Sequence, residues 1–199
     1  MAGKFSVISR WSYRLSLPLS VPDPRRDKLL AVHSGLYVVM GVSGSGKSLI
    51  GSRFARALGL EFVEGDTYHS PENVSRMSAG IPLTDEDRQA WLAAIAARLD
   101  AARRTGAGLV VSCSALKRSY REVLRAGRTD VQFVYLEGDR ALIEQRLADR
   151  RGHFMPSSLL DSQFAILEPP SADEHAWVCD IRQPPDAIVA HLVECSLSR

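Results

Sequence analysis

The sequence predicts an α/β fold in three layers, with a five-stranded parallel sheet between two layers of helices. Short apolar runs alternate along the chain with segments whose apolar residues recur at helical spacing, which is the pattern of parallel strands joined by helices. A glycine-rich stretch that fits a phosphate-binding motif lies between the first run and the first helical segment. The five predicted strands are 36–40, 61–64, 109–113, 131–136 and 177–180.

Length and composition are those of one ordinary globular domain. The chain has 199 residues, of which 45% are hydrophobic and 24% are charged. A net charge of +2 does not indicate nucleic-acid or membrane partners, and no apolar run approaches the roughly 18 residues of a membrane-spanning helix. Three widely spaced cysteines without zinc-site spacing are typical of reduced thiols. We therefore expect a cytoplasmic protein.

Residues 1–34 differ in composition from the rest of the chain. No acidic residue occurs before Asp23, whereas basic residues and serines are frequent. This composition is compatible with a transit peptide. Composition alone is weak evidence, and we favour a disordered extension or a start assigned too far upstream. In either case we expect the folded domain to span residues 35–199.

The glycine-rich stretch runs from Gly41 to Ser48 and matches the P-loop pattern G-x-x-x-x-G-K-[ST]. Its glycines let the backbone curl, so that amide groups at a helix N-terminus point toward an anion. Lys47 would reach the β- and γ-phosphates, and Ser48 would bind Mg²⁺. The alternative is a chance turn rich in glycine and serine, which the flanking strand and helix disfavour. The predicted nucleotide-binding residues here are Gly41, Ser43, Gly44, Ser45, Gly46, Lys47, Ser48 and Leu49.

Two acids close the second predicted strand, in the order Glu64-Gly65-Asp66. Acids at the carboxyl end of a strand in an open α/β sheet lie where ligands bind. Asp66 would orient a substrate hydroxyl or accept its proton, and Glu64 would hold a Mg²⁺-bound water. The alternative is a turn acid with local hydrogen bonds. We favour the substrate-binding role for Asp66. For Glu64, the metal-binding role and the turn role are equally favoured.

Residues 67–107 are predicted as a helical insert between the second and third strands. Ser70 followed by Pro71 is a helix-start signal. A longer helix is expected to begin after Thr84, with Asp87 completing a capping box that has a shorter acid than usual. An insert at this place is suited to binding a second substrate.

The helix predicted after the third strand carries Lys117, Arg121 and Arg125 at i, i+4 and i+8, so that they share one face. A basic stripe at the mouth of the sheet suits a carboxylate or a phosphate. The alternative is a solvated helix face, which fits Arg125 well and the other two less well.

The next helix is predicted over 139–150 and contains Arg146 and Arg150, shortly before Gly152. Arginines at this spacing near a glycine are typical of a mobile lid over phosphates, here about 150–158. The alternative is favourable placement of cations at a helix C-terminus. We favour the functional interpretation for Arg150. A helix over about 157–167, the fifth strand and a helix that starts at the adjacent prolines 184 and 185 complete the chain.

Several P-loop classes are excluded by missing motifs. The single asparagine, Asn73, precedes Val74, so the Asn-Lys-x-Asp motif of GTPases does not occur. The Leu-Ser-Gly-Gly-Gln signature of transporter ATPases and the Asp-Glu strand end of helicases are absent too. Small size, the insert and the paired arginines indicate a small-molecule kinase.

More specific stretches point to one family. Cys113-Ser114-Ala115-Leu116-Lys117 with Tyr120-Arg121 and Gly152-His153-Phe154 are the most distinctive. On these residues the chain resembles the small P-loop gluconokinases over roughly 36–195. Further matches are Gly65-Asp66, His69, Asn73, Met77, Gly80, Pro82-Leu83, Asp85, Asp87-Arg88, Trp91, Arg150, Gln163-Phe164 and Leu167-Glu168-Pro169. Arg76 stands where lysine is usual, and Glu64 where aspartate is common.

The resemblance implies ATP-dependent phosphorylation of D-gluconate to 6-phosphogluconate, with ATP and Mg²⁺, on a nucleoside-monophosphate-kinase-like fold that is commonly dimeric. The implied catalytic residues are Lys47, Asp66 and Arg150, the metal-binding residues are Ser48 and Glu64, and the substrate-binding residues are Asp66, His69, Arg76, Lys117 and Arg121. Arg146 would contact the adenine or the phosphates. Two alternatives stay open: another small hydroxy-acid kinase, such as one that acts on shikimate, and a catalytically silent nucleotide-binding regulator.

Overall fold

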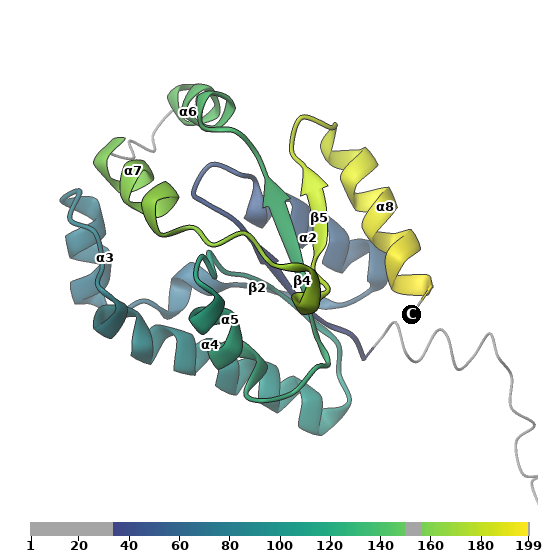
Figure 1. Ribbon diagram of the computed structural model, residues 1–199. Coiled ribbons are helices and arrows are strands. Elements are labelled where there is room, and N and C mark those ends of the chain that lie inside the picture. The colour runs from purple at the N-terminus through teal and green to yellow at the C-terminus, as the bar shows by residue number, and fades with distance from the viewer. Residues whose placement is uncertain (1–33, 150–156, 199) are drawn as a thin grey trace, which may run out of the picture.

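A five-stranded, fully parallel sheet forms the centre of the molecule in the computed structural model, which describes residues 34–149 and 157–198 (Figure 1). The strand order is β2-β3-β1-β4-β5. The predicted fold class is therefore confirmed, and the strand ends differ from expectation by at most one residue. The strands are β1 (Leu36–Met40), β2 (Glu61–Glu64), β3 (Leu109–Ser112), β4 (Val131–Glu137) and β5 (Trp177–Asp180).

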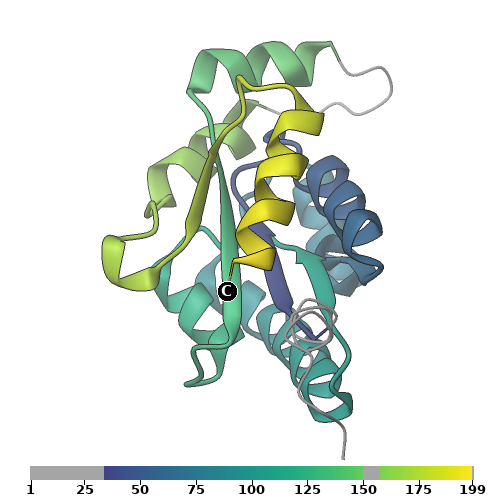
Figure 2. The ribbon, with the colours of Figure 1, turned by 90° about the vertical axis from the view of Figure 1, so that its right-hand side faces the viewer.

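The central strand β1 is buried along its whole length because helices cover both faces of the sheet. Tyr37 and Val39 point into one core, and Val38 and Met40 point into the other, as the alternation of side chains along a strand requires. The first core packs against α2 (Lys47–Leu58) and α8 (Pro185–Leu197), which lie side by side (Figure 2). The second core packs against α4 (Asp85–Thr105) and α5 (Arg118–Arg125).

Helices α3, α6 and α7 lie toward the carboxyl end of the sheet. Figure 1 shows α6 beyond the tip of β4, with α7 and then α3 beside it. Their bounds are α3 (Pro71–Ser78), α6 (Arg140–Ala148) and α7 (Ser157–Ile166), and the short 3₁₀ helices are η1 (Gly65–Tyr68) and η2 (Ala172–Glu174). The carboxyl end of a parallel sheet is where α/β proteins place their ligands. Helices α3 and α7 supply part of the wall of the candidate site there.

Both predicted caps of the insert helices are present. The Ser70 hydroxyl accepts a hydrogen bond from the Asn73 backbone N–H at 3.2 Å, at the start of α3. At the start of α4, the Asp87 N–H donates to Thr84 Oγ1 at 3.2 Å and the Thr84 N–H donates to Asp87 Oδ2 at 2.7 Å. This reciprocal capping box orients the first turn of α4, which borders the site.

A buried ion pair joins α5 to η2. The side chains of Arg121 and Glu174 are 1% and 2% exposed. Arg121 Nε and Nη2 donate to the two carboxylate oxygens of Glu174 at 2.6 and 2.7 Å, and these bonds lower the pKa of Glu174 below its usual 4.5. Nη1 donates to the carbonyl oxygens of Ala115, Leu116 and Glu168. One guanidinium therefore connects the loop before α5, the segment after α7 and η2.

Replacing Arg121 with alanine is expected to destabilise the fold by about 3–5 kcal/mol, because Glu174 would be left as a buried charge without its partner. Urea denaturation followed by circular dichroism measures this loss. The matched control is Arg118→Ala on the same helix, whose pairs with Asp173 and Glu122 are exposed and should contribute only about 0–1 kcal/mol. Equal small losses in both variants would contradict this account of the buried pair.

Candidate active site

The loop between β1 and α2 has the curled backbone that a phosphate-binding loop requires. Gly41 and Gly46 have φ angles of +141° and +99°, in the region that favours glycine. A Cβ on Gly41 would also lie only 2.9 Å from the carbonyl oxygen of Leu136, whereas a Cβ on Gly46 would meet nothing within 4 Å. Backbone conformation alone therefore demands glycine at position 46, and no side chain fills the cradle there.

Lys47 begins α2 and folds back over the loop. Its side chain is nearly buried, and Nζ donates to the carbonyl oxygen of Val42 at 3.1 Å. Ser45 Oγ is buried without a hydrogen-bond partner in the described part of the chain. Ser48 and Leu49 are exposed on the first turn of the helix. The ammonium group and the curled backbone thus lie where an anion would contact both.

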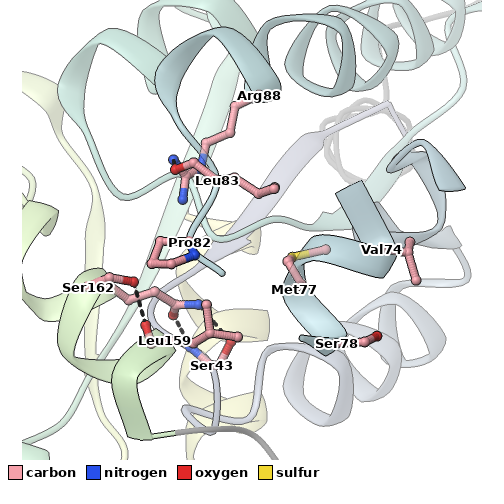
Figure 3. Close-up of a pocket in the computed structure, with 10 residues that line it drawn as sticks. Ser43, Val74, Met77, Ser78, Pro82, Leu83, Arg88, Leu159 and Ser162 are labelled. Atoms are coloured by element: carbon pink, nitrogen blue, oxygen red, sulfur yellow. Dashed lines mark hydrogen bonds between the residues drawn. The ribbon is translucent and has the colours of Figure 1, made fainter. Parts of the chain in front are cut away.

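Helix α7 contacts this loop through Gln163, a residue to which the sequence assigned no role. The Ser43 N–H donates to Gln163 Oε1 at 2.7 Å, and Gln163 Nε2 donates to Ser43 Oγ at 3.1 Å (Figure 3). The two bonds hold the amide of Gln163 against the middle of the loop. The sequence does not predict this contact, because 120 residues separate Ser43 from Gln163.

The end of β2 is held by hydrogen bonds from two neighbouring elements. Ser112 Oγ donates to Glu64 Oε1 and accepts the Gly65 N–H at 3.2 Å. Trp91 Nε1 on α4 donates to the Gly65 carbonyl oxygen at 2.8 Å. A Cβ on Gly65 would come within 2.0 Å of the Ser112 carbonyl oxygen, so only glycine fits here. The Glu64 carboxylate is therefore engaged with Ser112, and Asp66 follows at a defined position.

Two adjoining pockets lie between the phosphate-binding loop, the segment after β2 and helices α3, α4 and α7. The inner pocket is lined by Ser43, Lys47, Asp66 and His69, so the structure brings together four of the predicted site residues. Its complete lining is Ser43, Lys47, Asp66, His69, Met77, Leu83, Arg88, Trp91, Ser114, Leu116 and Gln163. The outer pocket (Figure 3) is lined by Ser43, Val74, Met77, Ser78, Pro82, Leu83, Arg88, Leu159, Ser162 and Gln163.

The His69 side chain lines the inner pocket and packs against an aromatic ring. Its ring stacks on Trp91, with centroids 4.2 Å apart and an interplanar angle of 16°. Burial lowers the pKa of His69 from its usual 6.5, against an opposing effect of the Asp66 carboxylate and with a smaller lowering by the Arg88 guanidinium. The imidazole is therefore neutral at pH 7. Nδ1 is buried and has no hydrogen-bond partner among the described residues.

The predicted basic stripe on α5 does not reach the pockets. Arg121 is neither a substrate contact nor part of a solvated face, because it lies in the buried pair with Glu174. Lys117 Nζ instead binds both carboxylate oxygens of Asp85, at 2.8 and 2.7 Å. Arg125, expected on a solvated face, lies over the Phe133 ring at 5.1 Å. The residues that share one face of α5 point toward the protein.

Two other predicted contacts also lie outside the pocket linings. Arg76 Nη1 donates to Asp87 Oδ1 at 3.0 Å, which uses the cation within the insert. Arg146 Nη2 donates to the Ile181 carbonyl oxygen at 2.6 Å, beside the turn from β5 to α8. Arg150 and most of the predicted lid fall outside the described residues.

Arg88 lines both pockets, and the sequence assigned it no role. A signal for it was present: Arg88 lies one turn before Trp91, on the stripe of α4 that carries Leu92 and Ile95 into the core. A charged residue at a buried-stripe position next to a helix start indicates a side chain that faces a site rather than solvent.

Within residues 34–149 and 157–198, no group of three or more histidine, cysteine or acidic side chains is arranged to hold a metal ion. Any metal at this site would therefore need ligands from a bound phosphate or from water. In the same residues, no helix has both the length and the apolar composition to cross a membrane.

Comparison with known proteins gives the family. Residues 36–170 match the AAA domain family. The thermoresistant gluconokinase of Escherichia coli is 44% identical over 160 residues, which cover 80% of this chain and 91% of that protein. The gluconokinase of Gluconobacter oxydans is 46% identical over 156 residues, covering 78% and 88%. A crystal structure of a gluconokinase from Sinorhizobium meliloti superimposes with a TM-score of 0.76 at 49% identity, covering 84% and 93%. Because relatives of this similarity match over most of their length, the chain belongs to the gluconokinase family.

Proposed function

We propose that this protein transfers the γ-phosphoryl group of ATP to D-gluconate and releases 6-phosphogluconate and ADP. The observation that carries the proposal is one pocket lined by Lys47 of the phosphate-binding loop and by Asp66 at the end of β2, in a member of the gluconokinase family. A phosphoryl donor and an alcohol acceptor need these two groups side by side.

The loop is suited to the phosphates of ATP. Its glycine conformations leave the cradle open, and the Lys47 ammonium is directed back over it. Transfer of a phosphoryl group depends mainly on positioning and on neutralising charge, which are the contributions that backbone amides and a lysine make. The residues proposed to bind the nucleotide are Gly41, Ser43, Gly44, Ser45, Gly46, Lys47, Ser48, Leu49 and, near the adenine or phosphates, Arg146.

The residues present also fit Mg²⁺. The Ser48 hydroxyl is exposed on the first turn of α2, and the Glu64 carboxylate at the end of β2 is partly accessible to a metal-bound water. When bound, Mg²⁺ neutralises charge on the phosphates. The hydrogen bond from Ser112 fixes the orientation of the Glu64 carboxylate.

The acceptor is proposed to bind in the inner pocket. The Asp66 carboxylate orients the terminal hydroxyl and accepts its proton as the oxygen attacks phosphorus. The neutral His69 imidazole, held by Trp91, is placed to hydrogen bond with a hydroxyl group of the acceptor chain. Arg150 is proposed to contact the transferred group, and this role rests on the family resemblance alone.

We further infer a homodimer in the cytoplasm, without nucleic-acid or membrane partners. The dimer rests on the family resemblance. The cytoplasmic location is supported by Cys113, Cys179 and Cys195, which are all free thiols. Another hydroxy-acid kinase and a silent regulator are less favoured, because the named relatives over most of this chain are gluconokinases.

With purified protein, ADP release is expected to require gluconate. Glucose should be a poor acceptor because it lacks the carboxylate, and shikimate should be poor because its ring does not match an open-chain acid. A coupled assay with ATP and Mg²⁺ and each acceptor in turn measures this. ADP release that is equal without an acceptor, or faster with shikimate, would contradict the proposed reaction.

The variant Lys47→Ala is expected to lower kcat by about a hundredfold to a thousandfold, since it removes one donor of charge stabilisation in the transition state. The same assay gives kcat, and thermal unfolding reports whether the fold survives. Arg53→Ala is the matched control, because Arg53 lies further along α2 in an exposed pair with Asp186. Near-normal turnover in Lys47→Ala would remove the phosphate-binding role of the loop.

A chain shortened to begin at Gly35 is expected to fold and to keep its activity. We propose residues 35–199 as the catalytic domain, with 1–34 as a separate extension. Support comes from the Gly35 carbonyl oxygen, which already accepts the Leu109 N–H at 2.9 Å and so belongs to the first pairing of the sheet. Kinetics and thermal unfolding of both lengths test the division. Aggregation or lost activity in the shortened chain would show that residues 1–34 pack on the domain.

A further inference from the structure

We infer that Arg88 binds the carboxylate of the acceptor and makes the enzyme selective for a sugar acid over an uncharged polyol. The inference rests on the proposed function and adds to it the residue that recognises the acid. The basic stripe on α5 does not supply that group, because its cations are engaged elsewhere in the protein.

Arg88 is the cation available to an acceptor in this site. Among the described residues that line the two pockets, the charged bases are Lys47 and Arg88, and His69 is neutral at pH 7. Lys47 belongs to the phosphate-binding loop, and its Nζ donates to the Val42 carbonyl oxygen of that loop. Arg88 comes from α4 and borders both pockets. A carboxylate that enters this site therefore has one cation left to pair with.

The acids beside Arg88 are paired with other cations. Asp85 binds Lys117 at 2.7 Å and accepts the hydroxyl of Tyr120, and Asp87 binds Arg76 at 3.0 Å. No ion pair joins Arg88 to an acid in the described part of the chain, and its Nε and Nη2 make no hydrogen bond there. A cation that lacks an internal carboxylate is suited to a carboxylate from a ligand.

The Arg88 guanidinium is nevertheless held in place. Nη1 donates to the backbone carbonyl oxygens of Leu83 and Thr84, the latter at 3.2 Å, and the group lies 5.8 Å from the centre of the Tyr120 ring. The capping box at the start of α4 fixes the same turn of backbone. A planar guanidinium with one nitrogen anchored presents its remaining N–H groups in a set direction, which favours recognition of a planar carboxylate.

The arrangement also matches the two ends of gluconate. The hydroxyl group that receives the phosphoryl group is at the opposite end of the carbon chain from the carboxylate. Asp66 and Lys47 line the inner pocket together with Ser43 of the phosphate-binding loop. Figure 3 shows Arg88 across the outer pocket from Ser43. An extended acid can therefore place its hydroxyl beside the loop and its carboxylate beside Arg88.

Steady-state kinetics of Arg88→Met tests the inference, with gluconate, ATP and D-glucitol varied in turn. D-Glucitol carries a hydroxymethyl group in place of the carboxylate. The KM for gluconate is expected to rise about ten- to a hundredfold, as loss of a charge-assisted contact predicts, whereas the KM for ATP stays within about twofold. The preference for gluconate over D-glucitol in kcat/KM should fall by a similar factor. Arg88→Lys should recover part of the gluconate affinity, because it keeps the charge without the planar fork.

The matched control is Arg98→Met on the same helix, whose exposed pair with Glu61 lies away from both pockets; its constants should equal those of the wild type. Gluconate turnover by the wild type tests the proposed function separately, and its absence would overturn both statements. With an active wild type, an unchanged KM for gluconate in Arg88→Met, or an equal loss for D-glucitol, would overturn the role of Arg88 alone. If Arg88→Met does not fold, Arg88→Lys decides by the same two ratios.

Discussion

The hydrogen bond from Trp91 to the Gly65 carbonyl oxygen connects the two halves of the candidate site. It fastens α4, which carries Arg88, to the segment after β2, which carries Asp66. The contact is possible because Gly65 has no side chain and packs directly against the backbone of β3. Trp91 also supplies the surface on which His69 stacks. The relative position of Asp66, His69 and α4 in the inner pocket therefore depends on one buried indole.

Around this contact, the protein separates cations that maintain the fold from cations that can serve a ligand. Arg121 forms a buried ion pair with Glu174. Lys117 pairs with Asp85 at the start of α4, and Arg76 pairs with Asp87 on the same turn. The pairs of Lys117 and Arg76 engage Asp85 and Asp87, two acids that lie near Arg88 in the first turn of α4. The buried pair adds a second effect, since the same guanidinium holds the backbone of Ala115 and Leu116, beside Ser114 in the wall of the inner pocket. The wall of the inner pocket is thus held by an ion pair that lies outside the pocket lining.

The local parts of the site were predictable for physical reasons. A phosphate-binding loop is defined by backbone conformations over eight consecutive residues, so its glycines and Lys47 can be identified without knowing the fold. The capping residues Ser70 and Thr84 bond to groups three residues away. The acid at position 66 follows a strand whose apolar run ends at a recognisable point. In each case the partners are close in sequence, and the chemistry of the residue restricts the geometry.

The sequence by itself therefore determined the fold class, the phosphate-binding loop, Asp66 as the acid at the strand end and the family. Tertiary structure alone decided which cations line the pockets. Helical spacing predicts that Lys117, Arg121 and Arg125 share a face, but it does not tell whether that face meets solvent, a ligand or a buried acid. Glu174 lies 53 residues after Arg121, and Asp85 lies 32 residues before Lys117. Charged side chains reach several ångströms and pair with whichever opposite charge folding brings near, so their roles follow from packing rather than from pattern.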